Sequence, residues 1–205
     1  MTPLQIGDYA GTFVFAVTGA LAAAEKRLDI GGFILLGFVT GVGGGTLRDM
    51  LLDRGVVFWA TDPAYIVICA AASIATFFAA ERFASRRRLL IWADALGLAL
   101  FASIGAGIAW GMGSRPIVAI LMGALTATGG GVIRDIIRNE LPIVLHREIY
   151  VTAALAGAAA FVGLAEWGAP RPVPMLGGIA VAFAMRAAGI VMDWHLPSFK
   201  PRGAA

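Results

Sequence analysis

The stretch TGVGGGTLRD, residues 40–49, returns 86 positions later as TATGGGVIRD, residues 126–135. Each copy places three glycines and then an Arg-Asp pair inside a long apolar segment. Glycine weakens a helix by about 1 kcal/mol relative to alanine, and charged side chains are costly in apolar surroundings. Two copies of so costly a combination indicate a functional or structural need.

The similarity between the copies extends to a larger unit. When residues 8–49 are aligned with residues 94–135 without gaps, 16 of the 42 pairs are identical. Chance would give about a tenth in a chain this rich in alanine and glycine. The alignment slips by one residue farther on, where Tyr65 corresponds to Tyr150. The sequence therefore predicts an internal duplication.

Composition places both copies in a membrane. The 205 residues are 59% hydrophobic and 14% charged, with a mean hydropathy of +0.82, whereas soluble domains carry about 25% charged residues. The fold class predicted is an all-α integral membrane protein with seven transmembrane helices, since a span needs roughly 20 mainly apolar residues. Seven segments qualify: 6–24, 31–53, 63–82, 90–110, 116–138, 147–167 and 173–193.

The basic residues predict the orientation of these helices. Loops on one side of the membrane hold ten Lys or Arg residues and loops on the other side hold three. By the positive-inside rule the N-terminus is outside and the C-terminus is cytoplasmic. The pI of 9.5 is therefore a signal of topology, with contacts to anionic lipid head groups as a side role, and not of nucleic-acid binding. The ten are Lys26, Arg27, Arg82, Arg86, Arg87, Arg88, Arg138, Arg147, Lys200 and Arg202; the three are Arg54, Arg115 and Arg171.

Three spans per copy determine how the copies are related. Because three is odd, the second copy must cross the membrane in the opposite direction to the first. The predicted organisation is a first three-helix repeat over residues 1–85, an inverted second repeat over 86–170, and a seventh helix with a cytoplasmic tail over 171–205, all in one membrane domain. Inverted repeats of this kind are typical of transport proteins.

The glycine triplets are the candidate site. Both lie near the middle of a span, where we expect the helix to kink or break, and inversion would make these weak points face each other near the midplane. Freed backbone groups are tolerated in a membrane only when buried in protein or facing water. The alternative is that the glycines only permit close helix packing, and that the threonines only bond their own helix. The predicted ion pathway comprises Gly43, Gly44, Gly45, Gly129, Gly130, Gly131, Thr40, Thr126 and Thr128.

The charged pairs Arg48/Asp49 and Arg134/Asp135 lie one turn beyond the triplets. Adjacent residues point in different directions on a helix, so we expect each arginine to bind carbonyls, a carboxylate of another helix or water rather than simply its neighbour. Anchoring at the head groups is the alternative.

Three other charged residues lie within or at the ends of the spans. Asp8 and Asp94 open the first and fourth spans and are expected to be helix caps, with a role in a vestibule of the pathway as the alternative. Arg186 has three candidate partners, namely Glu81, Glu166 or a carboxylate of the pathway, and the sequence does not distinguish among them.

The motifs do not favour an enzyme. His146 and His195 have no partners at metal-ligand spacing, so no fixed metal site is expected. GVGGGT, residues 41–46, lacks the final glycine of the dinucleotide fingerprint, a preceding strand, and the Gly-Lys-Ser/Thr of a P-loop. We predict neither a catalytic site nor a cofactor.

At these residues the sequence resembles a known family. Two GGGxxRD motifs, the Leu141-Pro142 and Arg147–Tyr150 segments after the second, and seven spans are similar to bacterial trimeric intracellular cation (TRIC) channels, also catalogued as a glycine-transporter domain. The resemblance implies a bacterial inner-membrane homotrimer. Each subunit would enclose an hourglass-shaped pore for monovalent cations, chiefly K⁺, lined by the second and fifth helices bent at the glycines. Animal members have a lysine-containing motif where Arg48 and Arg134 lie here, so their lipid-binding and gating details are not carried over.

The expected function is passive permeation of K⁺, with Na⁺ as a further permeant ion. Exposed carbonyls and threonine hydroxyls near the triplets would replace part of the hydration shell of a transient ion. Arg48 and Arg134 would hold the bends by pairing with carboxylates; acting as electrostatic barriers is the alternative. The rival function is a secondary transporter of a small amino acid such as glycine, because inverted repeats suit alternating access equally well.

Overall fold

The computed structural model describes residues 3–82, 86–170 and 172–197 of the chain. Every regular element in these ranges is helical apart from one isolated bridge between Glu148 and His195. The elements are α1 (Pro3–Glu25), α2 (Ile30–Leu51), α3 (Phe58–Thr61), α4 (Ala64–Ala79), η1 (Ala80–Arg82), α5 (Arg86–Gly111), α6 (Pro116–Ile137), η2 (Ile143–Leu145), α7 (Val151–Glu166) and α8 (Pro172–Val191).

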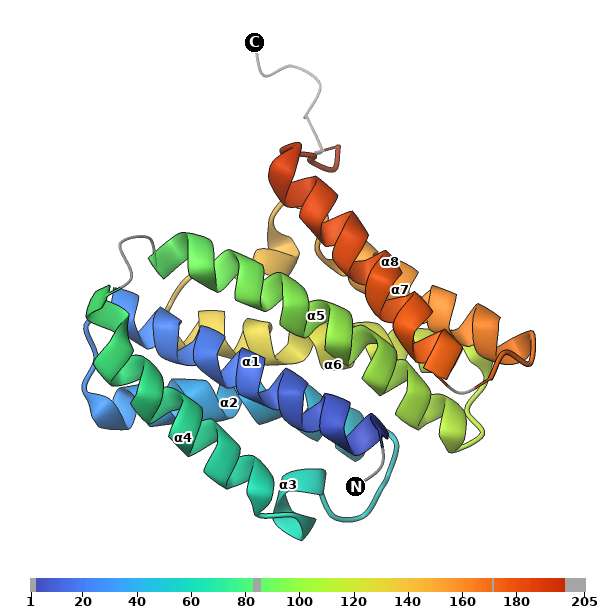
Figure 1. Cartoon of the computed structure of the whole chain (residues 1–205), viewed down its shortest axis with the longest axis horizontal. Coiled ribbons are helices and arrows are strands. Elements are labelled where there is room, and N and C mark those ends of the chain that lie inside the picture. The colour runs from blue at the N-terminus through green and yellow to red at the C-terminus, as the bar shows by residue number, and fades with distance from the viewer. Residues whose placement is uncertain (1–2, 83–85, 171, 198–205) are drawn as a thin grey trace.

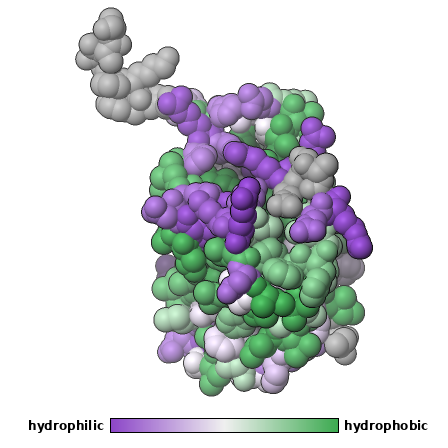
Figure 2. All heavy atoms as spheres, turned by 90° about the vertical axis from the view of Figure 1, so that its left-hand side faces the viewer, coloured by the Kyte–Doolittle hydropathy of each residue, from purple (hydrophilic) through white to green (hydrophobic). Residues whose placement is uncertain are grey.

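The helices have the length and composition of membrane spans. Six of the described helices are long and apolar enough to cross a membrane, and α7 is a shorter apolar helix of 16 residues. They run back and forth along one general direction, with α7 and α8 beside α5 (Figure 1). Hydrophilic side chains gather in the upper half of the end shown in Figure 2, and mainly hydrophobic ones lie below them. The all-α membrane fold class is confirmed.

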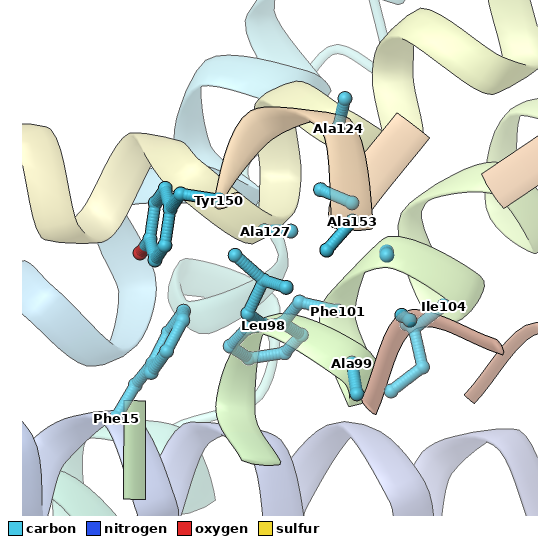
Figure 3. Close-up of a cluster of buried hydrophobic side chains, with 12 residues drawn as sticks. Phe15, Leu98, Ala99, Phe101, Ile104, Ala124, Ala127, Tyr150 and Ala153 are labelled. Atoms are coloured by element: carbon cyan, nitrogen blue, oxygen red, sulfur yellow. The ribbon is translucent and has the colours of Figure 1, made fainter. Parts of the chain in front are cut away.

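Helix α5 lies at the centre of the largest apolar core. Its residues Leu98, Phe101 and Ile104 pack with Phe15 of α1 and with alanines of α6 and α7 (Figure 3). α5 contacts α1, α6, α7 and α8. Its small residues allow these close approaches, since alanine adds little bulk between helices.

The spans follow the sequence closely, but their ends differ. α1 and α5 begin at Pro3 and Arg86, so Asp8 and Asp94 lie inside these helices and are buried. The prediction that they cap helices is wrong, because each helix continues several residues before the aspartate. The short helices α3 and η2 were not predicted. The proposed boundaries at residues 85 and 171, and the basic residues Lys200 and Arg202, lie outside the described residues.

Contacts between the two halves of the chain are reciprocal. The ring of Phe15 in α1 lies against Gly97 of α5, and the ring of Phe101 in α5 lies against Gly11 of α1. A Cβ atom at Gly97 would come within 2.3 Å of Phe15, and one at Gly11 within 2.9 Å of Phe101. Residues 11 and 97, and residues 15 and 101, are partners in the 86-residue alignment. Such exchange of equivalent contacts is what a twofold relation produces.

Candidate functional site: the crossing of α2 and α6

The two glycine triplets meet where α2 crosses α6. A Cβ atom at Gly44 would lie 2.0 Å from the carbonyl oxygen of Thr126, and one at Gly130 would lie 2.1 Å from the carbonyl oxygen of Thr40. Both contacts are to backbone, which cannot rotate aside. Glycine is therefore required here by the close approach of two helix backbones.

The flanking glycines repeat this exchange. Gly43 faces Ile133, and Gly129 faces Leu47, whose Cδ1 would be 3.1 Å from an added Cβ. All six triplet glycines are buried. The two triplets therefore lie against each other at this crossing, and their role in an ion pathway stays a prediction.

The predicted break in these helices is wrong. Residues 30–51 and 116–137 are helical throughout, including both triplets. The packing explains this result, because each triplet fits against the backbone of the opposite helix and needs no break to do so. Close packing, the alternative considered for the glycines, is what the structure contains. A bend within the continuous helices stays a prediction.

The threonines of the predicted pathway bond to their own helices. The hydroxyls of Thr40 and Thr126 donate to the carbonyl oxygens of Leu36 and Met122, each at 2.6 Å, and Thr128 donates to Ala124 at 2.9 Å. These are the i−4 bonds common for threonine in apolar helices. Each threonine hydroxyl oxygen can still accept a hydrogen bond, but its hydrogen is already donated to a carbonyl of the same helix.

The Arg-Asp pairs are buried, and each arginine binds its neighbour. The Nε of Arg48 donates to Asp49 at 2.8 Å, and the Nε of Arg134 donates to Asp135 at 2.8 Å. All four residues are at most 3% exposed, so anchoring at the head groups does not describe them. The expectation of a partner other than simply the neighbour is wrong for Arg48, because its long side chain folds back over the next residue.

Each aspartate also holds the loop that follows its helix. The second carboxylate oxygen of Asp49 accepts from the Phe58 amide at 3.0 Å, and that of Asp135 accepts from the Ile143 amide at 3.2 Å. These amides begin α3 and η2. The spacing is nine residues in the first half and eight in the second, which accounts for the one-residue slip in the alignment.

We expect Asp49→Ala to loosen the loop between α2 and α3. Loss of a capping carboxylate costs about 0.5–2 kcal/mol, so hydrogen exchange at the Phe58 amide should accelerate while exchange in the middle of α2 stays slow. Asp49→Asn, which keeps an acceptor oxygen, should have a smaller effect. Equal exchange at Phe58 in all three proteins would contradict this role.

Two polar clusters flank the crossing, and they differ. In the first half the Tyr65 hydroxyl donates to Asp8 at 2.8 Å, and among the described residues Arg48 forms no ion pair with Asp8. In the second half Arg134 pairs with Asp94 at 2.8 Å and also donates to Thr18. The expected carboxylate from another helix is thus present for Arg134.

The tyrosines and aspartates of these clusters were not assigned to the site from the sequence. The alignment pairs Asp8 with Asp94 and Tyr65 with Tyr150, and both tyrosines are buried. Recurrence in both halves was the signal that could have found them.

Arg186 of α8 belongs to the edge of the second cluster. Its guanidinium binds Glu148 at 2.6 Å and the carbonyl oxygen of Ile149 at 3.2 Å, and it lies 5.1 Å from the centre of the Tyr150 ring. None of the partners considered from the sequence is used. The Glu148 side chain is 39% exposed and binds an arginine that is only 2% exposed.

An ion-pair network joins the two halves at one end of the molecule. Arg138, after α6, binds Glu25 of α1 at 2.6 Å and Glu140 at 3.1 Å, and Lys26 binds Glu140 at 2.9 Å. Burial raises the pKa of Glu140, but the hydrogen bond from Lys26 and the charge of Arg138 outweigh this effect and lower the pKa below 4.5.

The lowered pKa gives the network a pH dependence. A carboxyl group with a depressed folded-state pKa stabilises the fold above its unfolded pKa, and this contribution disappears as pH falls through the folded value. Near neutral pH we therefore expect Glu140→Gln to lower the Tm slightly, since the pair is exposed and screened. The two proteins should converge in thermal melts as pH falls through the lowered pKa of Glu140; a gap that widened on acidification would contradict the assignment.

Two surface hollows lie away from the crossing. One, of about 470 Å³, is lined by Leu141, Leu145, His146, Arg147, Glu148 and His195. The other, of about 380 Å³, is lined by residues of α1, α2, α4 and η1. Among the described residues no three His, Cys, Asp or Glu side chains converge as metal ligands would.

Comparison with known proteins gives consistent matches over the whole chain. The family model described as "Glycine transporter" matches twice, over residues 5–81 and 91–166. The UPF0126 inner membrane protein YadS of Escherichia coli K12 is 39% identical over 197 residues, covering 94% of each chain.

Solved structures agree with the sequence matches. A TRIC channel orthologue from Rhodobacter sphaeroides has a TM-score of 0.92 at 52% identity, covering 95% of this chain and all of the other. A structure described in connection with conductance through TRIC cation channels has a TM-score of 0.89 at 34% identity, covering 99% and 100%.

Proposed function

This chain belongs to the bacterial TRIC channel family, and on that premise we propose that it is a passive channel for monovalent cations, chiefly K⁺. The pathway runs within each subunit, between α2 and α6. The observation that carries the proposal is the placement of two backbone carbonyls, those of Thr40 and Thr126, directly against glycines of the opposite helix.

The repeat architecture supports a pathway at this place. The two halves of the chain are inverted three-helix repeats, residues 1–85 and 86–170, followed by α8 as a seventh span. Two separate matches to one family model and the reciprocal contacts of Phe15 and Phe101 with glycines support this organisation. In inverted-repeat transport proteins the site lies at the midplane, where the repeats meet.

The crossing supplies the groups that a cation needs. The two backbones touch in this structure, and in our proposal this contact is the closed state. When α2 and α6 separate, the carbonyls of Thr40 and Thr126 lose contact with the opposing glycines and become available to replace water around an ion. An added methyl at Gly44 or Gly130 would obstruct the closed contact, which explains why the narrowest point consists of glycine.

The charged pairs lie beyond the narrow point on both sides. Arg48 and Arg134 are each four residues after the glycine at the crossing, or about 6 Å along the helix. Because the helices run in opposite directions in inverted repeats, one arginine lies toward each face. Their paired carboxylates neutralise them, so they hold the ends of α2 and α6 in place and do not repel cations from the path.

The proposed oligomeric state and membrane location of this chain are those described for its relatives. Relatives are described as trimeric channels and as inner membrane proteins. We propose a homotrimer in the bacterial cytoplasmic membrane with the N-terminus outside and the C-terminus cytoplasmic, in contact with membrane lipids and not with nucleic acid. K⁺ would bind only transiently near the glycines, and Na⁺ is the second permeant ion to test.

Reconstitution in liposomes distinguishes the channel from a glycine carrier. A channel gives discrete unitary currents in planar bilayers and dissipates a K⁺ gradient at a rate that rises with the gradient. A carrier gives saturable uptake of labelled glycine without current steps. K⁺ flux without glycine uptake is the expected result, and saturable glycine uptake without unitary currents would overturn the proposal.

A further inference from the structure

A hollow at one end of the first repeat combines charges of both signs with aromatic side chains. It has a volume of about 380 Å³ and lies where α1 ends, α2 begins and α4 runs into η1 (Figure 1). Its lining includes Arg27 and Glu81 together with Phe33, Phe77 and Phe78. At this end of the molecule hydrophilic side chains adjoin a hydrophobic surface (Figure 2). A hollow of this kind at the end of a spanning bundle is accessible to lipid head groups.

The two charged side chains of the hollow do not bind each other. Among the described residues neither Arg27 nor Glu81 forms an ion pair, whereas the neighbouring Lys26 binds Glu140 at 2.9 Å. Both side chains are exposed. A guanidinium binds phosphate through paired N–H donors, and a carboxylate accepts hydrogen bonds from an ammonium. Because the two groups line one hollow without joining, a ligand that carries a phosphate and an ammonium can bind both.

The backbone at Arg27 indicates that its side chain has a local use. Arg27 has a φ of 55°, in the left-handed region, and its partner in the second repeat is Gly113, with a φ of 80°. In both turns the next residue donates its amide hydrogen to the carbonyl oxygen four residues before, at 3.2 Å and 3.1 Å. Glycine adopts this conformation freely, and arginine adopts it at a cost. A topology signal needs a basic residue in this loop but not at this strained position.

The aromatic side chains of the hollow are also confined to the first repeat. Phe33 corresponds to Ala119 at the interval of 86 residues, and Phe78 corresponds to Gly163 at the interval of 85 that follows the slip in the alignment. The second repeat forms the same helices with these small residues, so the helices do not require the rings. Phe78 is 70% exposed. An exposed ring beside a hollow at the end of a span offers an apolar surface to an acyl chain.

We propose that this hollow binds a phospholipid with a primary ammonium head group, as in phosphatidylethanolamine. Arg27 binds the phosphate, Glu81 accepts hydrogen bonds from the ammonium, and Phe78 packs along an acyl chain. Phosphatidylglycerol has no ammonium, the ammonium of phosphatidylcholine has no N–H, and phosphatidylserine adds a carboxylate that Glu81 repels. The inference goes beyond the proposed channel function, because binding of the lipid does not depend on the passage of ions.

Lipid titrations followed by native mass spectrometry test the head-group preference. Phosphatidylethanolamine and phosphatidylcholine with identical chains are added separately to the purified protein in detergent. The first should bind about fivefold more tightly, the factor expected for one exposed charged pair. Glu81→Gln should make the two affinities equal. Glu166→Gln changes the repeat counterpart of Glu81, also exposed, and should keep the preference. Equal binding by the parent protein, or a preference that survives in Glu81→Gln, would overturn the proposal.

Arg27→Gly separates lipid binding from folding. Glycine suits the left-handed backbone, so without lipid the Tm should stay the same or rise. The affinity for both lipids should fall about fivefold, because both carry the phosphate that the guanidinium binds. Asp53→Gly is the matched control: Asp53 is exposed and has a φ of 49°, but it does not line the hollow. It should leave lipid affinity unchanged, and unchanged affinity in Arg27→Gly would reject the site.

Phe78→Ala distinguishes a lipid from a second copy of the chain as the occupant. It should weaken binding of both lipids without changing the mass of the oligomer. Val67→Ala, on the same helix and 65% exposed, should change neither quantity. Loss of the oligomer in Phe78→Ala with unchanged lipid binding would overturn the proposal and assign the hollow to a contact between subunits. None of these measurements uses current, so failure of the channel proposal would leave this result intact.

Discussion

Gly130→Ala should lower the apparent Tm of the purified protein by about 2–12 °C. The added methyl would lie 2.1 Å from the carbonyl oxygen of Thr40, and this atom belongs to backbone that cannot move without shifting α2. Overpacking costs about 1–3 kcal/mol, and a protein of this size loses about 2–4 °C per kcal/mol. Gly44→Ala, with the equivalent clash against Thr126, should behave alike.

Gly163→Ala is the matched control for these substitutions. It is also a helical glycine, in α7, but no atom lies within 4 Å of its added methyl. Alanine favours a helix over glycine by up to about 1 kcal/mol, so its Tm should stay the same or rise slightly. If all three variants melted together, the close approach of α2 and α6 would not be a source of stability.

Arg134→Gln should destabilise the protein by about 3–5 kcal/mol, because breaking a buried ion pair leaves its carboxylates uncompensated. Arg134 is 1% exposed and binds both Asp94 and Asp135. The K⁺ to Na⁺ permeability ratio of the surviving channels should not change, since the arginine holds the helix end and does not select ions. Denaturation in detergent and bilayer reversal potentials measure the two effects.

Two further variants make this prediction decisive. Arg54→Gln removes an arginine that also binds a buried aspartate, Asp49, but its own side chain is 35% exposed, so it should cost no more than about 1 kcal/mol. Adding Asp94→Asn to Arg134→Gln removes one uncompensated charge and should recover part of the loss. A shifted permeability ratio with unchanged stability would instead make Arg134 an electrostatic barrier.

The membrane fold and the pairing of the glycine triplets could be predicted because they depend on features that repeat along the sequence. Apolar segments of span length, together with a motif recurring at an interval of 86 residues, identify the helices and their most crowded point. The continuity of α2 and α6 through the triplets could not be predicted. Helix propensity describes glycine in an isolated helix and does not include the packing of the α6 backbone against Gly44.

The partners of the charged residues could not be predicted for a different reason. Each depends on how loops return to the helix ends: Asp49 reaches Phe58 only after the chain reverses, and Arg186 meets Glu148 only because α8 packs on α7. Residue spacing along one helix contains no information about these contacts. The differing bonds of Asp8 and Asp94 were equally inaccessible, since the repeats alone would make them the same.

Cysteine modification tests the central claim most directly, namely that ions pass where α2 crosses α6 inside each subunit. Leu47→Cys, whose native side chain on α2 faces Gly129 of α6, is introduced into Cys69→Ser protein, which has no other cysteine. Single-channel currents are then recorded with a cationic thiol reagent. Current should fall in three equal steps, one per subunit. The same reagent on Leu121→Cys, on the outer face of α6 with 50% exposure, should leave the current unchanged. Full current through channels completely modified at residue 47 would contradict the account.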